Sequence, residues 1–139
     1  MNSDVASRLV FDSFALLAFL QRERGGRQVA VMLRQAETDD VSIALSAINL
    51  GEVLYITERR HGIPAATAAL GFVEQLPVRI VDADVRRTVQ AARFKARYRM
   101  SYADAFAASL ALEVKATVVT GDPEFEQVEE LVPVCWLAG

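Results

Sequence analysis

Short, uninterrupted runs of apolar residues, separated by helix-length segments, constrain the fold of this chain more than any other feature. Five such runs occur, at residues 8–12, 41–45, 78–81, 117–120 and 133–136. Strands that are apolar along their whole length must be covered on both faces, as in a parallel sheet between two layers of helices. The sequence therefore predicts an α/β fold.

Helix start and stop signals divide the segments between these strands. Ser46 and Ser101 are typical N-cap residues, and Gly62 ends the segment before it. The predicted helices span residues 14–22, 27–38, 47–60, 64–76, 85–99, 102–115 and 124–131, with Asp82 or Asp84 capping the fifth. Two helices thus follow each of the first three strands and one follows the fourth, which is the pattern of a parallel sheet.

Composition narrows the possible functions. The chain has 139 residues, 53% of them hydrophobic, which is enough for one packed domain over residues 1–139. The only Cys and the only His, Cys135 and His61, exclude a disulfide framework and a Cys/His zinc site within one chain. A single His also weakens any Ser-His-Asp or Cys-His catalytic interpretation. The net charge of −3 excludes nucleic-acid binding by bulk basicity.

Membrane and targeting segments are not expected. Uncharged stretches such as Val41–Gly51 and Ala105–Leu112 are well short of the roughly 20 apolar residues of a spanning helix. The run Leu9–Leu20 is interrupted by Asp12 and is not followed by a signal-peptide cleavage pattern. We therefore expect a cytoplasmic protein that makes no membrane contact.

Two aspartates follow strands of the predicted sheet. Asp12 ends the first strand, and Asp122 lies two residues beyond the fourth. Ligands of open parallel sheets bind beyond the carboxyl ends of the strands, where the strand order reverses. Taken singly, each aspartate is better explained as a turn or helix-cap residue.

Glu52 is harder to explain by structure alone. Ile48 and Ile56 lie one turn before and one turn after it, which centres this carboxylate on an apolar stripe. A buried, unpaired carboxylate is costly, so Glu52 needs a cation, a metal or a proton. The structural alternative is a carboxylate at the edge of the stripe that pairs with an Arg.

Asp104 has two competing explanations. It follows Ser101 by three residues, which is the spacing of a capping box. However, it is also the only charge between Met100 and Leu112, and small alanines follow it on the same face. Such a face lets another part of the chain approach the carboxylate closely.

The four carboxylates together suggest more than each does alone. A cluster of carboxylates repels itself unless a positive charge lies among them. Hard oxygen ligands on a rigid frame favour Mg²⁺ or Mn²⁺ over zinc, and Mg²⁺ typically completes its shell with water and substrate phosphate. The cluster therefore points to metal-assisted phosphoryl chemistry.

At these residues the chain resembles the PIN-domain ribonucleases, and specifically the VapC-type toxins of bacterial toxin–antitoxin modules. The resemblance covers residues 8–136. The stretches that carry it are Val-Phe-Asp-Ser-Phe-Ala-Leu-Leu at 10–17, Ser-Ala-Ile-Asn-Leu-Gly-Glu-Val at 46–53, Ser-Tyr-Ala-Asp-Ala-Phe-Ala-Ala at 101–108, and Thr-Gly-Asp-Pro-Glu-Phe at 120–125. The motifs are individually short, and their order and spacing make them specific.

The resemblance implies a five-stranded parallel sheet in the order 3-2-1-4-5, flanked by helices. It also implies a Mg²⁺- or Mn²⁺-dependent endoribonuclease that inhibits growth as the toxin of a type II toxin–antitoxin pair. The residues that match the family's catalytic and metal-binding acids are Asp12, Glu52, Asp104 and Asp122. The residues expected to support them are Ser13, Asn49 and Thr120.

The expected partners are an RNA substrate, a small cognate antitoxin and a second copy of the chain in a homodimer. Arginines and a lysine crowd the fifth predicted helix and its end, where they either bind RNA phosphates or form a solvated helix end; they are Arg86, Arg87, Arg93, Lys95, Arg97 and Arg99. Tyr98 and Tyr102 either stack on bases or, more simply, pack in the core. The helices 47–60 and 64–76 carry apolar residues for antitoxin docking, self-association or ordinary core packing, namely Leu50, Leu54, Ala65, Ala68, Ala69 and Phe72.

Other classes fit less well. A haloacid-dehalogenase-like phosphatase needs a second Asp two residues after Asp12, where this chain has Phe14. A response-regulator receiver needs an acidic pair and a late Lys, and the segment Thr120-Gly121-Asp122 does not supply them. The remaining alternative is a PIN scaffold that binds RNA or a partner protein without significant nuclease activity.

Overall fold

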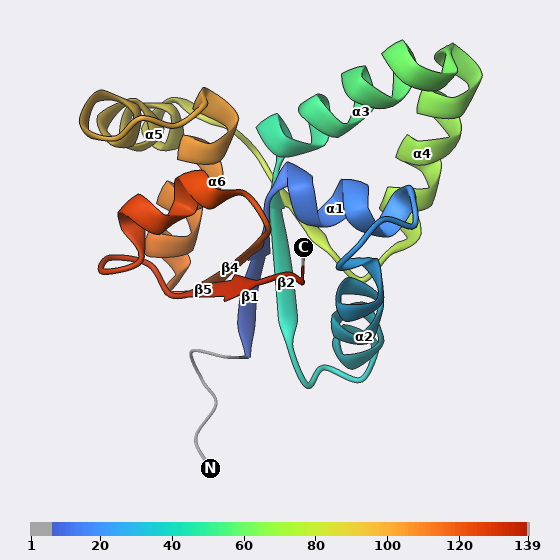
Figure 1. Cartoon of the computed structure of the whole chain (residues 1–139), viewed down its shortest axis with the longest axis horizontal. Helices are drawn as coiled ribbons and strands as arrows, with labels where there is room; N and C mark the ends of the chain where they lie inside the picture. Colours follow the sequence, from blue (N-terminus) through green and yellow to red (C-terminus); the bar gives the residue numbers. More distant parts are fainter. Residues whose placement is uncertain (1–6, 139) are drawn as a thin grey trace.

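The computed structural model describes residues 7–138 and shows a five-stranded sheet between two layers of helices (Figure 1). The strands are β1 (Arg8–Phe11), β2 (Ser42–Ser46), β3 (Arg79–Val81), β4 (Thr117–Thr120) and β5 (Val134–Trp136). The helices are α1 (Ser13–Leu20), α2 (Gly26–Glu37), α3 (Ala47–His61), α4 (Ile63–Gln75), α5 (Val85–Arg97) and α6 (Tyr102–Val114), and a 3-10 helix, η1, spans Pro123–Val128. The strand order is β3-β2-β1-β4-β5, and every pairing is parallel.

Alternate residues of the central strands contribute to two separate cores, because successive side chains of a strand point to opposite faces of the sheet. Val10 and Val118 pack with residues of α5, α6 and η1. Phe11 and Val119, their neighbours in sequence, pack with residues of α1, α2, α3 and α4. Both faces of the sheet are covered by helices, and this explains why the strands are apolar along their whole length.

The structure confirms the predicted α/β class, the parallel sheet and the strand order. Ser46 and Ser101 cap α3 and α6 as predicted. Asp84, one of the two predicted caps, caps α5. Helix α1 begins at Ser13, one residue earlier than predicted, and Asp12 caps it. One element differs in kind. The segment predicted as an α-helix over 124–131 is the shorter 3-10 helix η1, which begins at Pro123.

The sheet order determines where a ligand site can form. The chain builds outward from β1 through β2 to β3, and then returns to place β4 and β5 on the other side of β1. The order therefore reverses between β1 and β4, and the crevice beyond their carboxyl ends is the usual ligand site of such sheets. Asp12 follows β1 directly, and Asp122 follows β4.

Within residues 7–138, no helix has both the length and the apolar character needed to cross a bilayer.

Candidate active site

Asp12 is held at the carboxyl end of β1 by hydrogen bonds to both of its oxygens. It is 1% exposed. One oxygen accepts a hydrogen bond from the backbone N–H of Ala15 at 2.9 Å, and the other accepts one from the Thr120 hydroxyl. Thr120 Oγ1 in turn accepts a hydrogen bond from the backbone N–H of Asp122 at 2.9 Å. The hydroxyl of Thr120 thus joins the two aspartates that follow β1 and β4.

Asp104 lies in the first turn of α6, in a capping box that is only half formed. Its backbone N–H donates to Ser101 Oγ at 3.0 Å, as a capping box requires. The reciprocal bond is made by a different residue, since the backbone N–H of Ser101 donates to Glu124 Oε1 at 3.3 Å. The Asp104 carboxylate is therefore not used as a cap, although the residue is only 5% exposed.

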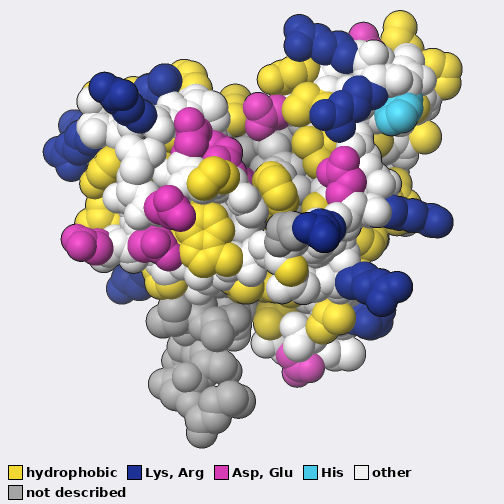
Figure 2. All heavy atoms as spheres, viewed as in Figure 1, with side chains coloured by type: hydrophobic (Ala, Val, Ile, Leu, Met, Phe, Trp, Pro, Cys, Tyr) yellow, Lys and Arg dark blue, Asp and Glu magenta, His cyan; other side chains and the backbone are white. Residues whose placement is uncertain are grey.

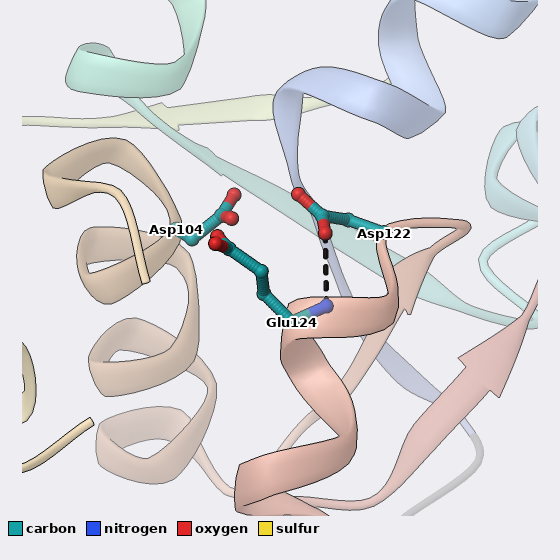
Figure 3. A group of neighbouring side chains, drawn as sticks. All are labelled: Asp104, Asp122 and Glu124. Atoms are coloured by element: carbon teal, nitrogen blue, oxygen red, sulfur yellow. Dashed lines mark hydrogen bonds between the residues drawn. The ribbon is translucent and has the colours of Figure 1, made fainter. Parts of the chain in front are cut away.

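Asp122 and Glu124 complete a group of three carboxylates with Asp104. One ligand oxygen from each residue lies within 4.8 Å of the other two. Figure 3 shows the three side chains converging from α6, from the loop after β4 and from η1. Asp122 Oδ1 also accepts a hydrogen bond from the backbone N–H of Glu124 at 2.9 Å, which orders the first turn of η1.

Glu52 lies at the border of this group and not within it. It is half-buried, and Tyr55 donates a hydrogen bond to its Oε2 at 3.4 Å. Its negative charge is the last and smallest of the causes that shift the pKa of Asp12. The buried row of α3 is Asn49, Val53 and Thr57, so Glu52 lies beside the buried stripe and not at its centre.

Asn49 is more deeply buried than its predicted position at the edge of the Glu52 face. Its side chain is 0% exposed, and Nδ2 donates to Ser13 Oγ at 3.1 Å and to the backbone carbonyl of Ala103 at 3.2 Å. Ser13 Oγ–H donates in turn to the backbone carbonyl of Asn49 at 3.3 Å. Asn49 therefore connects α3 to the residues that adjoin Asp12 and Asp104.

Burial makes the ionised forms of the aspartates costly in the metal-free protein. Desolvation raises the pKa of Asp12 to about 7, and the hydrogen bonds from Thr120 and Ala15 only partly oppose this effect. The pKa of Asp104 is also raised, first by burial, then by its hydrogen bond with Asp122 and by the negative charges of Asp122 and Asp12. Within residues 7–138, no Lys or Arg forms an ion pair with any of these carboxylates.

The donor set fits a hard divalent cation. Carboxylate oxygens from separate elements converge, and no Lys or Arg in the described part of the chain forms an ion pair with them. Mg²⁺ and Mn²⁺ prefer such oxygen ligands. A cation placed among them would remove the electrostatic cost that raises both pKa values. The structure brings together Asp104 and Asp122, and links Asp12 to them through Thr120.

Glu124 is the acidic residue that the sequence analysis gave no role. The sequence pattern predicts it at the first position of an α-helix over residues 124–131. The available signal was the turn Gly121-Asp122-Pro123, after which a Glu must lie close to Asp122. The tighter 3-10 geometry that starts at Pro123 turns Glu124 toward α6, where it meets both Ser101 and Asp104.

The arrangement defines a class: an α/β domain with a cluster of carboxylates at the point where the order of a parallel sheet reverses. The PIN domain family model matches residues 9–131, and the chain belongs to this family. A comparison with curated proteins found no match.

Several solved structures share the fold at low sequence identity. A structure of VapBC2 from Rickettsia felis, bound to a DNA fragment from its promoter, has a TM-score of 0.72 at 17% identity, covering 94% of this chain and 99% of that one. VapC20 from Mycobacterium tuberculosis, described as a sarcin-ricin loop cleaving toxin, has a TM-score of 0.68 at 20% identity, covering 86% and 94%. DNA-bound VapBC from Salmonella typhimurium has a TM-score of 0.69 at 18% identity, covering 92% and 96%.

Proposed function

We propose that this chain is a Mg²⁺- or Mn²⁺-dependent endoribonuclease. The observation that carries the proposal is the convergence of Asp104, Asp122 and Glu124, with Asp12 linked to them through Thr120. No Lys or Arg of residues 7–138 forms an ion pair with the group. Asp12, Asp104 and Asp122 would hold the metal, Glu52 would complete the site directly or through water, and Glu124 would offer a further carboxylate oxygen. A bound divalent ion supplies a water nucleophile at neutral pH and stabilises charge on the scissile phosphate.

The chain's own residues prepare the site for this chemistry. The hydrogen bonds from Ala15 and Thr120 fix the orientation of the Asp12 carboxylate, and Ser101 fixes the start of α6 beneath Asp104. Asn49 holds the first turns of α1 and α6 against α3. Such positioning matters because metal ligands depend on partners that orient them. The family resemblance implies a 5′-phosphate and a 3′-hydroxyl as the products, and hydrolysis by water does not need the 2′-hydroxyl.

The direct test is cleavage of RNA by the purified chain. Labelled RNA should be cut in the presence of Mg²⁺ or Mn²⁺, and cutting should stop with excess chelator and resume when metal is restored. Undiminished cleavage in chelator would contradict the metal-dependent mechanism. RNA binding without cleavage in either metal would favour the alternative, a PIN scaffold that holds RNA or a partner without nuclease activity.

RNA phosphates have basic residues beside the acidic site to contact. In the view of Figure 2, dark blue side chains gather over α5, and magenta carboxylates lie beside them toward α3. Arg93, Lys95, Arg97 and Arg99 are exposed on α5 and just after it. Arg87 is a weaker candidate, because it donates to both oxygens of Glu113 and pairs with Asp84. The exposed four should contribute a salt-dependent part of RNA affinity.

We further propose that the chain acts as the toxin of a toxin–antitoxin pair. Structures with the same fold include the VapBC proteins of Rickettsia felis and Salmonella typhimurium and a toxin–antitoxin complex from Klebsiella pneumoniae. A small antitoxin would bind this chain and suppress cleavage. Expression of the chain alone should arrest growth of a bacterial host, and substitution of Asp104 should relieve the arrest.

A large apolar groove is the best candidate for antitoxin docking. It has a volume of about 1000 Å³ and lies between the α1–α2 turn and α4. Phe72 is 49% exposed there and stacks on Phe19 with ring centroids 6.2 Å apart. Arg22 and Arg27 also line the groove, so it suits an antitoxin segment with both apolar and acidic residues.

Two of the predicted docking residues of α3 and α4 lie in different environments. Leu50 packs against the core, whereas Phe72 remains available in the groove. A homodimer that uses the same two helices would compete with the antitoxin for Phe72. Solution mass measured with and without the antitoxin separates the two arrangements, because an antitoxin bound at Phe72 would dissociate such a dimer.

A further inference from the structure

Phe14 is an exposed aromatic ring in an otherwise buried stretch beside the acidic site. It lies in the first turn of α1, two residues after Asp12, and its side chain is 40% exposed. Its neighbours Ser13 and Ala15 are 5% and 0% exposed. Single exposed apolar side chains are common on protein surfaces, so the position of this ring beside Asp12 matters more than its exposure.

The ring of Phe14 occupies the space that a side chain at residue 121 would fill. A Cβ atom added to Gly121 would lie 3.0 Å or less from three ring atoms, Cδ1, Cε1 and Cζ of Phe14. Gly121 has no positive φ, so the constraint is space and not backbone conformation. This glycine leaves the room that lets the ring lie against the backbone between Thr120 and Asp122.

That backbone joins two residues of the acidic network. Thr120 donates to Asp12, and the N–H of Asp122 donates to Thr120. Phe14 therefore lies at the rim of the site, with one edge of the ring packed on Gly121 and 40% of the residue exposed to solvent. A rigidly seated, partly exposed ring beside a phosphate-cleaving centre is the arrangement with which proteins stack bases of single-stranded nucleic acid.

We propose that Phe14 is a stacking platform for the base of a nucleotide next to the scissile phosphate; this inference rests on the proposed ribonuclease function. Phenylalanine has no hydrogen-bonding groups, so the platform binds any base and favours those that stack more strongly. Phe14 thus increases the affinity for RNA and positions the strand, whereas the carboxylates serve the cleavage of the phosphodiester bond.

The test compares the ring with a side chain of similar bulk at the same position. Phe14→Leu removes the aromatic ring, and Phe14→Tyr is the matched control that keeps it. A pool of single-stranded RNA oligonucleotides identifies one that the wild-type chain cleaves, and single abasic nucleotides are then placed along that oligonucleotide. KM and kcat are measured for each, with thermal unfolding showing that each variant is folded.

In the wild-type chain, one abasic position beside the cleaved bond should raise KM by about 5- to 100-fold, the range expected for loss of one stacked base. Phe14→Leu should raise KM for the intact RNA and lose this sensitivity to the abasic position, with kcat little changed. Phe14→Tyr should keep the wild-type KM and the wild-type sensitivity to the abasic position. As an independent readout, 5-iodouridine at the sensitive position should photo-crosslink to the peptide that contains Phe14.

One result would overturn the inference while leaving the proposed function in place, namely an abasic profile that is the same in Phe14→Leu as in the wild-type chain. If that variant also binds the antitoxin more weakly, the ring contacts the protein partner and not the RNA. If the wild-type chain neither binds nor cleaves any RNA of the pool with Mg²⁺ or Mn²⁺, the proposed function and this inference fail together.

Discussion

Helix α6 has a carboxylate near each end, and the two are accommodated in opposite ways. Near its C-terminus, Glu113 accepts two hydrogen bonds from Arg87, both at 3.2 Å, and Asp84 lies 3.5 Å from the same guanidinium. Near its N-terminus, Asp104 faces Asp122 and Glu124, and no Lys or Arg within residues 7–138 pairs with it (Figure 3). At the C-terminal end of α6, an arginine therefore compensates the carboxylates.

The contrast indicates that the acidic end is built for a cation from outside the chain. Asp104 is also the more buried of the two carboxylates, and so has the greater need of a partner. A structural role would predict the reverse arrangement, with the cation beside the buried residue. The difference between the two ends of α6 can be tested by substitution and by pH.

The largest effect is expected from Asp104→Asn. The substitution keeps the shape of the side chain and removes its charge, so RNA cleavage should fall below detection. The metal-free fold should be at least as stable, because one of several repelling carboxylates is gone. Cleavage assays and thermal unfolding of the same sample measure both quantities. An active Asp104→Asn variant would show that this residue has no part in catalysis.

A stability change with pH should be the next largest effect. Because the pKa of Asp12 is raised to about 7 in the folded state, the folded chain binds this proton more tightly than the unfolded chain does. The stability that protonation provides is present below about pH 4 and is lost as the pH rises to about 7. The raised pKa of Asp104 extends the loss to higher pH.

We expect this loss to amount to roughly 2–4 kcal/mol in the metal-free chain. Urea unfolding from pH 5 to pH 8 in chelator measures it, and saturating Mn²⁺ should restore stability at the upper end of this range. The prediction is wrong if the metal-free chain is as stable at pH 8 as at pH 5.

A moderate effect is expected from Glu52→Gln. No Arg within residues 7–138 pairs with Glu52, and its contact is the Tyr55 hydroxyl, so the fold should remain sound. Cleavage should fall by about 10- to 100-fold, as when a residue that supports a metal site is lost, and more Mn²⁺ should be needed for half-maximal rate. A large stability loss with unchanged Mn²⁺ dependence would remove Glu52 from the active site.

The smallest effect is expected at the opposite end of α6. Arg87→Met keeps much of the side-chain bulk and breaks the pairs with Glu113 and Asp84, whose side chains are 25% and 54% exposed. Partly exposed ion pairs contribute little, so stability should fall by about 1 kcal/mol or less, and RNA cleavage should be unchanged. A loss of cleavage without unfolding would mean that Arg87 binds the substrate and is not only structural.

Most of the fold could be predicted from the sequence because its signals are local. Continuous apolar strands, the caps Ser46 and Ser101, and the paired helices are each encoded within a few residues. The same holds for Asp12, which directly follows β1, and for Asp122, which lies two residues after β4. The family resemblance then supplied the strand order, which local patterns do not encode.

Contacts between distant segments could not be predicted. Nothing near Ser101 in the sequence shows that Glu124 takes over half of its capping box and frees the Asp104 carboxylate. The depth of Asn49 is set by Ser13 and Ala103, which lie far from it in the chain. The helical pattern placed the buried stripe of α3 at Glu52, whereas packing against the sheet buries the row that starts at Asn49.

The most direct test of the central claim is the effect of Mn²⁺ on the unfolding temperature at pH 8, measured without RNA. Because the carboxylates of the folded chain converge and those of the unfolded chain do not, Mn²⁺ should bind the folded state preferentially and raise Tm in a concentration-dependent way. Asp104→Asn should greatly reduce the shift, whereas Arg87→Met should retain it. A wild-type Tm that does not change with Mn²⁺, or an equal shift in Asp104→Asn, would contradict the account of this site as a metal centre.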